Sequence, residues 1–259
     1  MSERPTIAEL RARTQTPEVR GRRNSEHWTA DLYQRRLSPY LTRLIVGTSL
    51  TANAVTCLMI VTGAGAAAAL LVPGIVGALL AALLAQLQML WDCCDGEVAR
   101  WRGTSSPVGI FLDKVGHYTA EGLIPIALGV RADGGLGSIG DWTTLGALLS
   151  VLVLFNKALN DAVHVARAVA GLPRLEDRAE SAAPTVAGVR RLRAMARFLP
   201  FHRVFHSIEL TLLALVAAIL DVALGGLDGT QGLLVILLPV ALVTIGGHLL
   251  AILTSSRLR

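Results

Sequence analysis

Long, uninterrupted apolar runs are the feature that most limits what this chain can fold into. From about Leu50 to the C-terminus, stretches of roughly 20 apolar residues recur, and a helix of that length crosses a hydrocarbon core of about 30 Å. The runs lack the alternating pattern that the strands of an outer-membrane barrel need. Only 17% of the residues are charged and 53% are hydrophobic, which excludes an ordinary soluble domain. We therefore expect an all-α, polytopic membrane protein.

Six transmembrane helices are predicted from these runs. They are the segments 50–71, 75–94, 107–130, 142–167, 204–225 and 231–254. Arginines gather before the first span and in the connections 95–106 and 167–203, so the positive-inside rule places both termini on the cytoplasmic side of the cytoplasmic membrane. The excess of 24 Lys and Arg over 19 Asp and Glu thus belongs to a membrane surface, and we expect no nucleic-acid partner.

Residues 1–45 are expected to form a basic cytoplasmic leader, and residues 46–255 the six-helix transmembrane domain. The leader lacks the apolar region of a secretory signal, so the first span itself would direct insertion. The stretch His27–Leu44 mixes apolar, aromatic and basic residues, which predicts an interfacial amphipathic helix in contact with membrane lipids. A merely solvated leader is the alternative for residues 1–25. Residues 190–203 form a second candidate for binding to anionic lipid.

Ionisable side chains inside two of the predicted spans indicate a functional site, because each costs about 2.5–3.5 kcal/mol to insert at the centre of a membrane helix. They are Asp92, Asp95 and Glu97 at the end of the second span, and Asp113, His117 and Glu121 in the third. Spacings of three and four place Asp92 with Asp95 on one helical face, and Asp113 with His117 on another. Two antiparallel helices joined by a short turn would bring the three aspartates together near the cytoplasmic interface.

Three aspartates so close together predict a bound divalent cation, because like charges repel strongly where the dielectric constant is low. Carboxylate oxygens favour hard ions, so the expected metal is Mg²⁺ or Mn²⁺ rather than zinc. Small residues on the same faces, Gly96, Ala99 and Gly109, would leave room for a bulky ligand. The alternative is that the acids pair with neighbouring Arg and Lys side chains and that the small residues only pack.

The same residues form a recognisable pattern. The sequence reads Asp92-x2-Asp95-Gly96-x2-Ala99-Arg100-x8-Gly109-x3-Asp113-x3-His117. It resembles the signature of the CDP-alcohol phosphotransferase family, D-x2-D-G-x2-A-R followed, about eight residues later, by G-x3-D-x3-D. The segment 50–56, LTANAVT, is similar to the first-helix element of that family, with Ala52 in place of the usual proline. The resemblance covers about residues 38–255.

The resemblance implies an integral membrane enzyme, commonly a homodimer, that transfers a substituted phosphoryl group from a CDP-linked donor to an acceptor hydroxyl and releases CMP. We expect CDP-diacylglycerol as the donor, a small hydroxylated acceptor, and a place in phospholipid biosynthesis. The residues that match the metal-binding aspartates of the family are Asp92, Asp95 and Asp113. The residues that match its nucleotide site are Gly96, Ala99, Arg100 and Gly109, with Asn53 and Thr56 as weaker matches.

The last position of the signature departs from the family, because His117 stands where an aspartate is expected to deprotonate the acceptor and to help hold a second metal. A neutral imidazole, with a pKa of about 6.5, can also accept a proton near neutrality. We therefore predict that His117 is the general base and that His117 and Asp113 are both catalytic residues. As a metal ligand it would favour Mn²⁺ or a later transition metal over Mg²⁺. Glu121, one turn further, could supply the missing carboxylate or orient the imidazole.

Polar side chains on the fourth and fifth predicted spans are candidates for the acceptor side. They are Lys157, Asn160, Asp161 and His164 on the fourth span and His202, His206 and Glu209 on the fifth. They could line a pocket for a hydroxylated acceptor, or for a phosphorylated one through cations such as Lys157 or Arg203. The alternative is interhelical pairing, for instance of Lys157 with Asp161 or of His206 with Glu209.

Two other functions are open on sequence grounds. Intramembrane Asp, His and Glu residues also mark ion pathways, so a small ion-coupled transporter is one alternative, although the charges here gather toward one face of the membrane. A catalytically degenerate homologue that binds nucleotide without turnover is the other, because His117 replaces an aspartate. Substrate-dependent CMP release distinguishes the enzyme from both.

Overall fold

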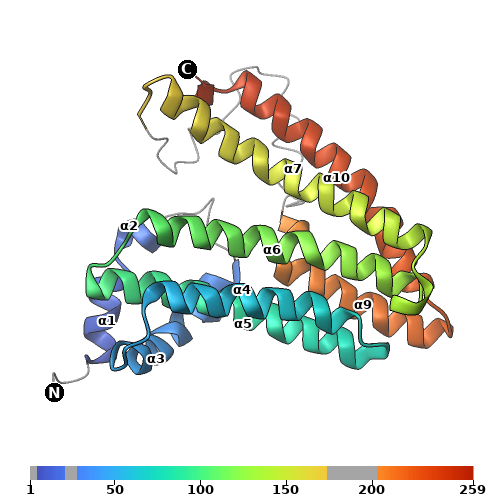
Figure 1. The fold of residues 1–259 in the computed structure, drawn as a ribbon, viewed down its shortest axis with the longest axis horizontal. Coiled ribbons are helices and arrows are strands. Elements are labelled where there is room, and N and C mark those ends of the chain that lie inside the picture. Colours follow the sequence, from blue (N-terminus) through green and yellow to red (C-terminus); the bar gives the residue numbers. More distant parts are fainter. Residues whose placement is uncertain (1–4, 21–27, 174–202, 259) are drawn as a thin grey trace. The chain divides into compact units, whose positions relative to one another are not determined.

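The computed structural model describes residues 5–20, 28–173 and 203–258, and within these ranges the regular structure is helical. The helices of the N-terminal part are α1 (Ile7–Thr14), α2 (Pro17–Arg20), the π-helix η1 (Ala30–Gln34) and α3 (Arg35–Val46). The long helices are α4 (Ala52–Leu70), α5 (Gly74–Arg102), α6 (Pro107–Ala132), α7 (Asp141–Val169), α9 (Ser207–Leu224) and α10 (Asp228–Thr254), with short 3-10 turns at η2 (Leu136–Ser138), η4 (Arg203–Phe205) and η5 (Ser256–Leu258). Figure 1 shows these elements in the order of the chain.

The predicted all-α, multi-pass class is confirmed. Helices α4, α5, α7, α9 and α10 are long and apolar enough to cross a membrane. The third predicted span, 107–130, also forms a helix, α6, but this helix carries Asp113, Lys114, Glu121 and Arg131 and is not among these five. The count of six spans therefore stays a prediction. Helix α5 continues past the predicted boundary at residue 94 to Arg102, so the first half of the signature lies on one continuous helix.

The chain divides into two compact units. Unit 1 contains residues 1–65 and 83–120, and unit 2 contains residues 66–82 and 121–259. Helices α4, α5 and α6 each contribute one part to unit 1 and the other part to unit 2. The whole signature, from residue 92 to residue 117, lies in unit 1 together with the N-terminal helices.

Helix α3 in unit 1 buries two hydroxyl side chains and exposes large apolar side chains together with Arg36 and Arg43. Ser38 and Thr42 are fully buried, whereas Leu37, Tyr40 and Leu44 are about half exposed. In water a helix would bury the apolar face instead, so this pattern suits a helix whose outer face meets lipid. The pattern supports an interfacial position for α3, which stays a prediction; His27, where the predicted segment begins, lies outside the described residues.

Small residues allow α4, α5 and α6 to approach closely within unit 1. A Cβ atom at Gly63 of α4 would lie 2.9 Å from the Cβ of Ala120 on α6 and 3.2 Å from the Cδ of Gln88 on α5. A Cβ atom at Gly116 would lie 3.0 Å from the Cε of Met59. Close packing around small residues is the usual way in which helices associate in lipid. It sets the spacing between the two helices that carry the acidic residues.

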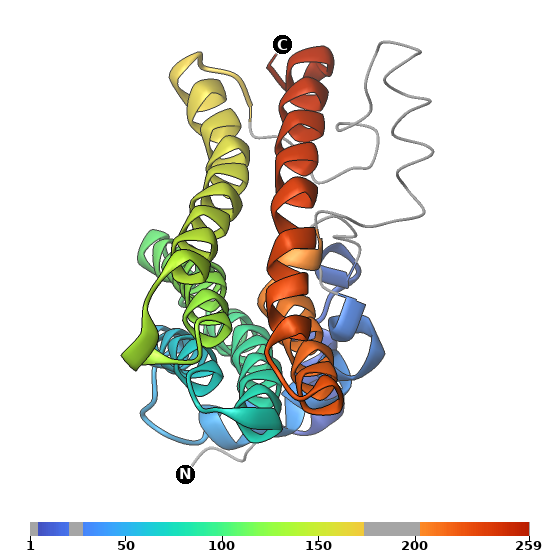
Figure 2. The ribbon, with the colours of Figure 1, turned by 90° about the vertical axis from the view of Figure 1, so that its right-hand side faces the viewer.

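In unit 2, helix α10 packs against both α7 and α9 (Figures 1 and 2). Buried charged side chains form hydrogen bonds with backbone groups at the turns of this unit. Arg131 donates to the carbonyl oxygens of Val72 at 3.1 Å and Gly74 at 2.8 Å, and Asp221 accepts from the backbone N–H of Thr230 at 2.9 Å. These bonds satisfy backbone groups that a membrane-embedded chain cannot leave to water.

Candidate active site

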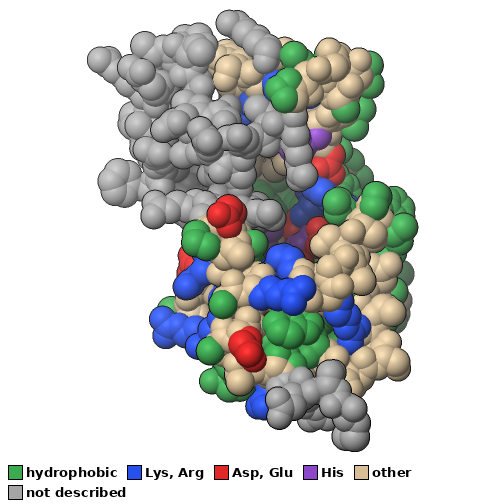
Figure 3. Space-filling model, turned by 90° about the vertical axis from the view of Figure 1, so that its left-hand side faces the viewer, with side chains coloured by type: hydrophobic (Ala, Val, Ile, Leu, Met, Phe, Trp, Pro, Cys, Tyr) green, Lys and Arg blue, Asp and Glu red, His purple; other side chains and the backbone are tan. Residues whose placement is uncertain are grey.

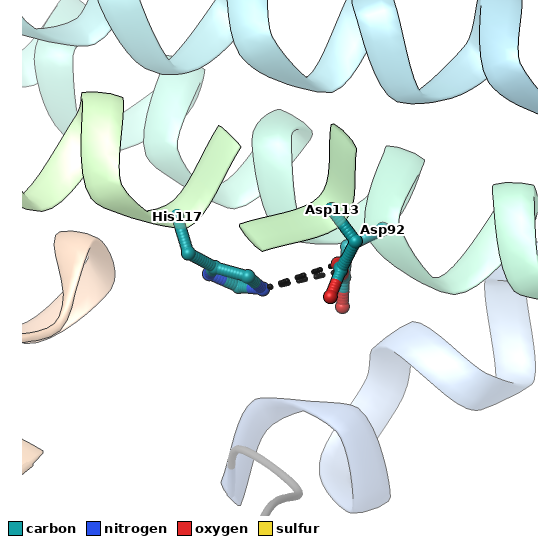
Figure 4. A group of neighbouring side chains, drawn as sticks. All are labelled: Asp92, Asp113 and His117. Carbon is teal, nitrogen blue, oxygen red and sulfur yellow. Dashed lines mark ion pairs between the residues drawn. The ribbon is translucent and has the colours of Figure 1, made fainter. Parts of the chain in front are cut away.

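Three predicted site residues converge in unit 1. His117 Nε2 lies 3.4 Å from Asp92 Oδ1 and 3.6 Å from Asp113 Oδ1. Asp113 and His117 are one turn apart on α6 and Asp92 is on α5; one potential ligand atom from each lies within 4.8 Å of the other two. Figure 4 shows the imidazole edge pointing at both carboxylates. The antiparallel arrangement expected from the sequence therefore does bring these side chains together.

The donor set of this cluster fits a divalent cation. Two carboxylates and an imidazole meet from two helices, and their side chains are 21% to 39% exposed, so that water or phosphate oxygens can reach the same point. Among divalent ions, the two oxygens suit Mg²⁺ or Mn²⁺, and the imidazole nitrogen favours Mn²⁺ over Mg²⁺. The cluster can thus hold a cation that faces an anionic ligand.

Asp95 has a different immediate partner. Its carboxylate is buried, and Asp95 Oδ2 accepts a hydrogen bond of 2.6 Å from Thr56 Oγ1 on α4. The structure thus places Thr56, predicted for the nucleotide site, against an aspartate predicted for the metal site. Asp95 is not in the three-residue group described above, so its role as a ligand stays a prediction.

The small residues of the signature lie beside its polar ones. A Cβ atom at Gly109 would lie 3.3 Å from Asn53 Oδ1, which brings Asn53 of α4 next to the start of α6. A Cβ atom at Gly96 would lie 3.0 Å from Nη1 of Arg100, so the guanidinium group of Arg100 lies over Gly96. Ala99 is partly exposed, and its carbonyl oxygen accepts from the N–H of Thr104 at 2.9 Å, just after the end of α5.

Glu97 is a site residue whose role the sequence did not reveal. It is fully buried, and its carboxylate accepts hydrogen bonds from Ser38 Oγ at 2.6 Å, Thr42 Oγ1 at 2.7 Å and the side-chain amide of Gln15 at 2.8 Å. Nη1 of Arg35 lies 3.8 Å from the same group. Glu97 therefore connects the N-terminal helices to α5, the helix that carries the first half of the signature. The available signal was the i, i+4 spacing of Ser38 and Thr42, which places both hydroxyl groups on one face of α3.

A second polar cluster lies in unit 2. Glu121 Oε1 lies 2.6 Å from Lys157 Nζ on α7 and 3.1 Å from His206 Nδ1, just before α9. Lys157 and His206 thus both contact Glu121, a partner that the sequence did not suggest for them. Asn156 Oδ1 and His248 Nδ1, 2.9 Å apart, form a further polar contact that was missed. His202 and most of the predicted lipid-binding stretch 190–203 lie outside the described residues.

These features define a class: a multi-pass membrane protein in which α5 and α6 carry a cluster of acidic and imidazole side chains that could hold a metal ion. The family model of CDP-alcohol phosphatidyltransferases matches residues 49–189, and the chain belongs to this family. A comparison with curated proteins finds no relative that matches. Membership makes the chain a phosphotransferase by class, with a CDP-alcohol as donor, a hydroxyl group as acceptor and a divalent metal ion as cofactor.

Proposed function

We propose that this protein moves a phosphatidyl group from CDP-diacylglycerol to a small hydroxylated acceptor in phospholipid biosynthesis. The convergence of Asp92, Asp113 and His117 inside the family signature carries this proposal. A diphosphate linkage is strongly anionic, so a site that binds it needs positive charge next to the acids. The apolar helices that bear the site would let a lipid-linked donor reach it from the bilayer.

The residues at the site have distinct proposed roles. Asp92, Asp95 and Asp113 hold the divalent cation, which when bound neutralises charge on the diphosphate and on the departing CMP. The acceptor oxygen forms a bond to the phosphorus of the phosphatidyl group, and the phosphorus–oxygen bond to CMP breaks. The acceptor hydroxyl loses its proton, which a general base must take.

His117 is the proposed base, and the position of its ring distinguishes this role from that of a metal ligand. The nitrogen that faces the carboxylates is Nε2. A nitrogen that donates its lone pair to a metal cannot accept a proton at the same time, so a base at Nε2 and a ligand at Nε2 are exclusive roles. If Nε2 is a metal ligand, substitution of His117 should change which metal supports activity. If Nε2 is the base, substitution should instead slow the transfer of the acceptor's proton.

The residues of the proposed nucleotide site have two roles: the small ones leave room near the backbone, and the polar ones contact the nucleotide. Gly96 lets the guanidinium group of Arg100 lie close to the backbone of α5, and Gly109 does the same for the side-chain amide of Asn53 at α6. Ala99 lies on α5 between Gly96 and the end of that helix. Asn53 and Thr56 approach from α4, and Arg100 contributes the positive charge near Gly96. This arrangement leaves the cytidine diphosphate a surface of backbone, amide and guanidinium groups to bind.

The membrane arrangement completes the proposal. We place the termini and the site at the cytoplasmic face of the cytoplasmic membrane, α3 at the interface, and residues 46–255 as the catalytic domain, in a homodimer. Lys157, with other polar groups of α7 and the start of α9, is proposed to line the acceptor side. The ion pair of Lys157 with Glu121 favours a second, structural role for the same residues, which is to hold α6 and α7 together.

A direct assay tests the function. Purified protein would be incubated with CDP-diacylglycerol, Mg²⁺ or Mn²⁺, and a panel of polyols, sugar phosphates and amino alcohols, with products identified by mass spectrometry. We expect CMP release that depends on acceptor and metal, and that Asp92→Asn abolishes while the exposed control Asp228→Asn does not. Donor binding without any product would indicate a degenerate homologue, and vesicle uptake of solute without CMP would indicate a carrier; either would refute the proposal.

A further inference from the structure

Helix α1 packs onto the end of the signature helix rather than extending away from it. A capping box starts α1: Thr6 Oγ1 accepts from the N–H of Glu9 at 3.2 Å, and the Glu9 carboxylate accepts from the N–H of Thr6 at 2.7 Å. Leu10 and Thr14 of this helix are fully buried. The guanidinium carbon of Arg13 lies 5.0 Å from the ring centre of Trp101 on α5. In space-filling view, the end of unit 1 that carries α1 presents Lys and Arg side chains around an apolar patch (Figure 3).

The end of α1 meets Arg100 directly. The Nε–H group of Arg100 donates a 2.7 Å hydrogen bond to the carbonyl oxygen of Thr14, across 86 positions of sequence. Because a guanidinium group is planar and rigid, a bond to Nε sets the plane in which both terminal nitrogens lie. Those nitrogens lie over Gly96, at 3.0 and 3.2 Å from where a Cβ atom there would be.

Gln15 fastens this end of α1. Its side-chain amide donates to Glu97 Oε1 at 2.8 Å and to the carbonyl oxygen of Arg35 at 2.8 Å. The residue is buried, and it follows immediately after Thr14, whose carbonyl oxygen holds Arg100. One side chain therefore ties α1, α3 and α5 together at the point where the arginine of the signature is oriented.

We propose that α1, fastened by Gln15, is a positioning element for Arg100 and so belongs to the donor-binding part of the enzyme. This inference rests on the proposed function, because it assumes that Arg100 lies in the nucleotide site. An arginine side chain has many rotamers, and a fixed guanidinium plane lets it bind an anion without first losing that freedom. Release of α1 would therefore weaken donor binding selectively and leave the acceptor side unaffected.

The experiment compares Gln15→Ala with Glu18→Ala, which removes an exposed carboxylate side chain close by in α2. The first measurement is amide hydrogen exchange across residues 7–15 in the full chain, without substrate. The second is the Kd for CDP-diacylglycerol in mixed micelles, and the third is the pair of KM values for donor and acceptor. We expect Gln15→Ala to speed exchange in α1 and to raise the donor Kd and KM at least about tenfold. The acceptor KM should change less than twofold, and Glu18→Ala should match the wild type.

A paired exchange of side chains supplies the rescue. Gln15→Glu alone sets two carboxylates about one hydrogen bond apart and should harm donor binding more than Gln15→Ala. Adding Glu97→Gln removes one of the two negative charges and lets an amide and a carboxylate bond again, so the double variant should recover part of the donor affinity that Gln15→Glu loses. The recovery should be incomplete, because a carboxylate at position 15 cannot donate to the carbonyl oxygen of Arg35.

The outcomes separate this inference from the proposed function. Wild-type donor affinity in Gln15→Ala, or an equal rise in the donor and acceptor KM, would overturn the positioning role while leaving the transfer reaction intact. If the wild type binds CDP-diacylglycerol without releasing CMP, the proposed transfer is refuted and the Kd comparison still tests Gln15. A wild type that does not bind CDP-diacylglycerol overturns both.

Discussion

Removal of the Glu97 carboxylate is expected to detach the N-terminal helices from α5. In Glu97→Ala, the buried hydroxyls of Ser38 and Thr42 and the amide of Gln15 lose their shared acceptor, and the positive charge of Arg35 loses a partner 3.8 Å away. Breaking a buried charged contact by removing one partner costs about 3–5 kcal/mol. At 1.4 kcal/mol per factor of ten, the lower figure corresponds to a roughly 150-fold change in the ratio of docked to undocked states.

Hydrogen exchange measures this ratio locally. The amides of α1 and of α3 should exchange about 150- to 4,000-fold faster in Glu97→Ala than in the wild type, while those of α10 should be unchanged. Glu97→Gln keeps one acceptor oxygen and should fall between the two. Asp31→Ala, which removes an exposed carboxylate from the same N-terminal part, is the matched control and should behave as the wild type. Equal exchange of α1 in Glu97→Ala and in the wild type would show that apolar packing alone holds these helices, which would refute the reasoning.

Two further predictions concern the metal site and the connection between α6 and α7. His117→Asp restores the carboxylate of the family signature, so the ratio of Mg²⁺- to Mn²⁺-supported activity should rise by about tenfold or more, since even outer-shell changes at metal sites have effects of that size. An unchanged ratio would show that His117 is not a ligand. In unit 2, the hydroxyl of Thr143, with backbone N–H groups, lowers the pKa of Asp133 below its ordinary value of 3.8. Because the pKa of Asp133 is lower in the folded state than in the unfolded state, its ionised carboxylate stabilises the protein at pH values above the unfolded-state pKa. This stabilisation is lost as the pH falls through the folded-state pKa. The thermal midpoint of Asp133→Asn should therefore lie below that of the wild type at pH 7, and the two midpoints should converge as the pH falls through the lowered pKa; a constant difference would contradict the assignment.

Features that depend on nearby residues could be predicted. The membrane class followed from the length of the apolar runs, because one helix must span the hydrocarbon by itself. The pairing of Asp113 with His117 followed from a spacing of four, which places both on one face of α6. The short connection between α5 and α6 then required Asp92 to lie near them.

Contacts between distant parts of the chain could not be predicted in the same way. Gln15 and Glu97 are 82 positions apart, and Thr56 and Asp95 are 39 apart. A hydroxyl or an amide can bond to many acceptors, so its residue type does not name its partner. The partner of Lys157 was likewise not fixed by its residue type. The sequence suggested Asp161 as a partner, and the structure shows an ion pair with Glu121.

By itself the sequence determined the long apolar helices and the faces on which the acids of α5 and α6 lie, because these features depend on the length and the period of a single helix. Only the tertiary structure decided that Thr56 bonds to Asp95, that Ser38 bonds to Glu97, and that Arg100 bonds to the carbonyl oxygen of Thr14. Each of these contacts needs two helices at a particular distance and rotation, which side-chain packing sets and no local pattern encodes.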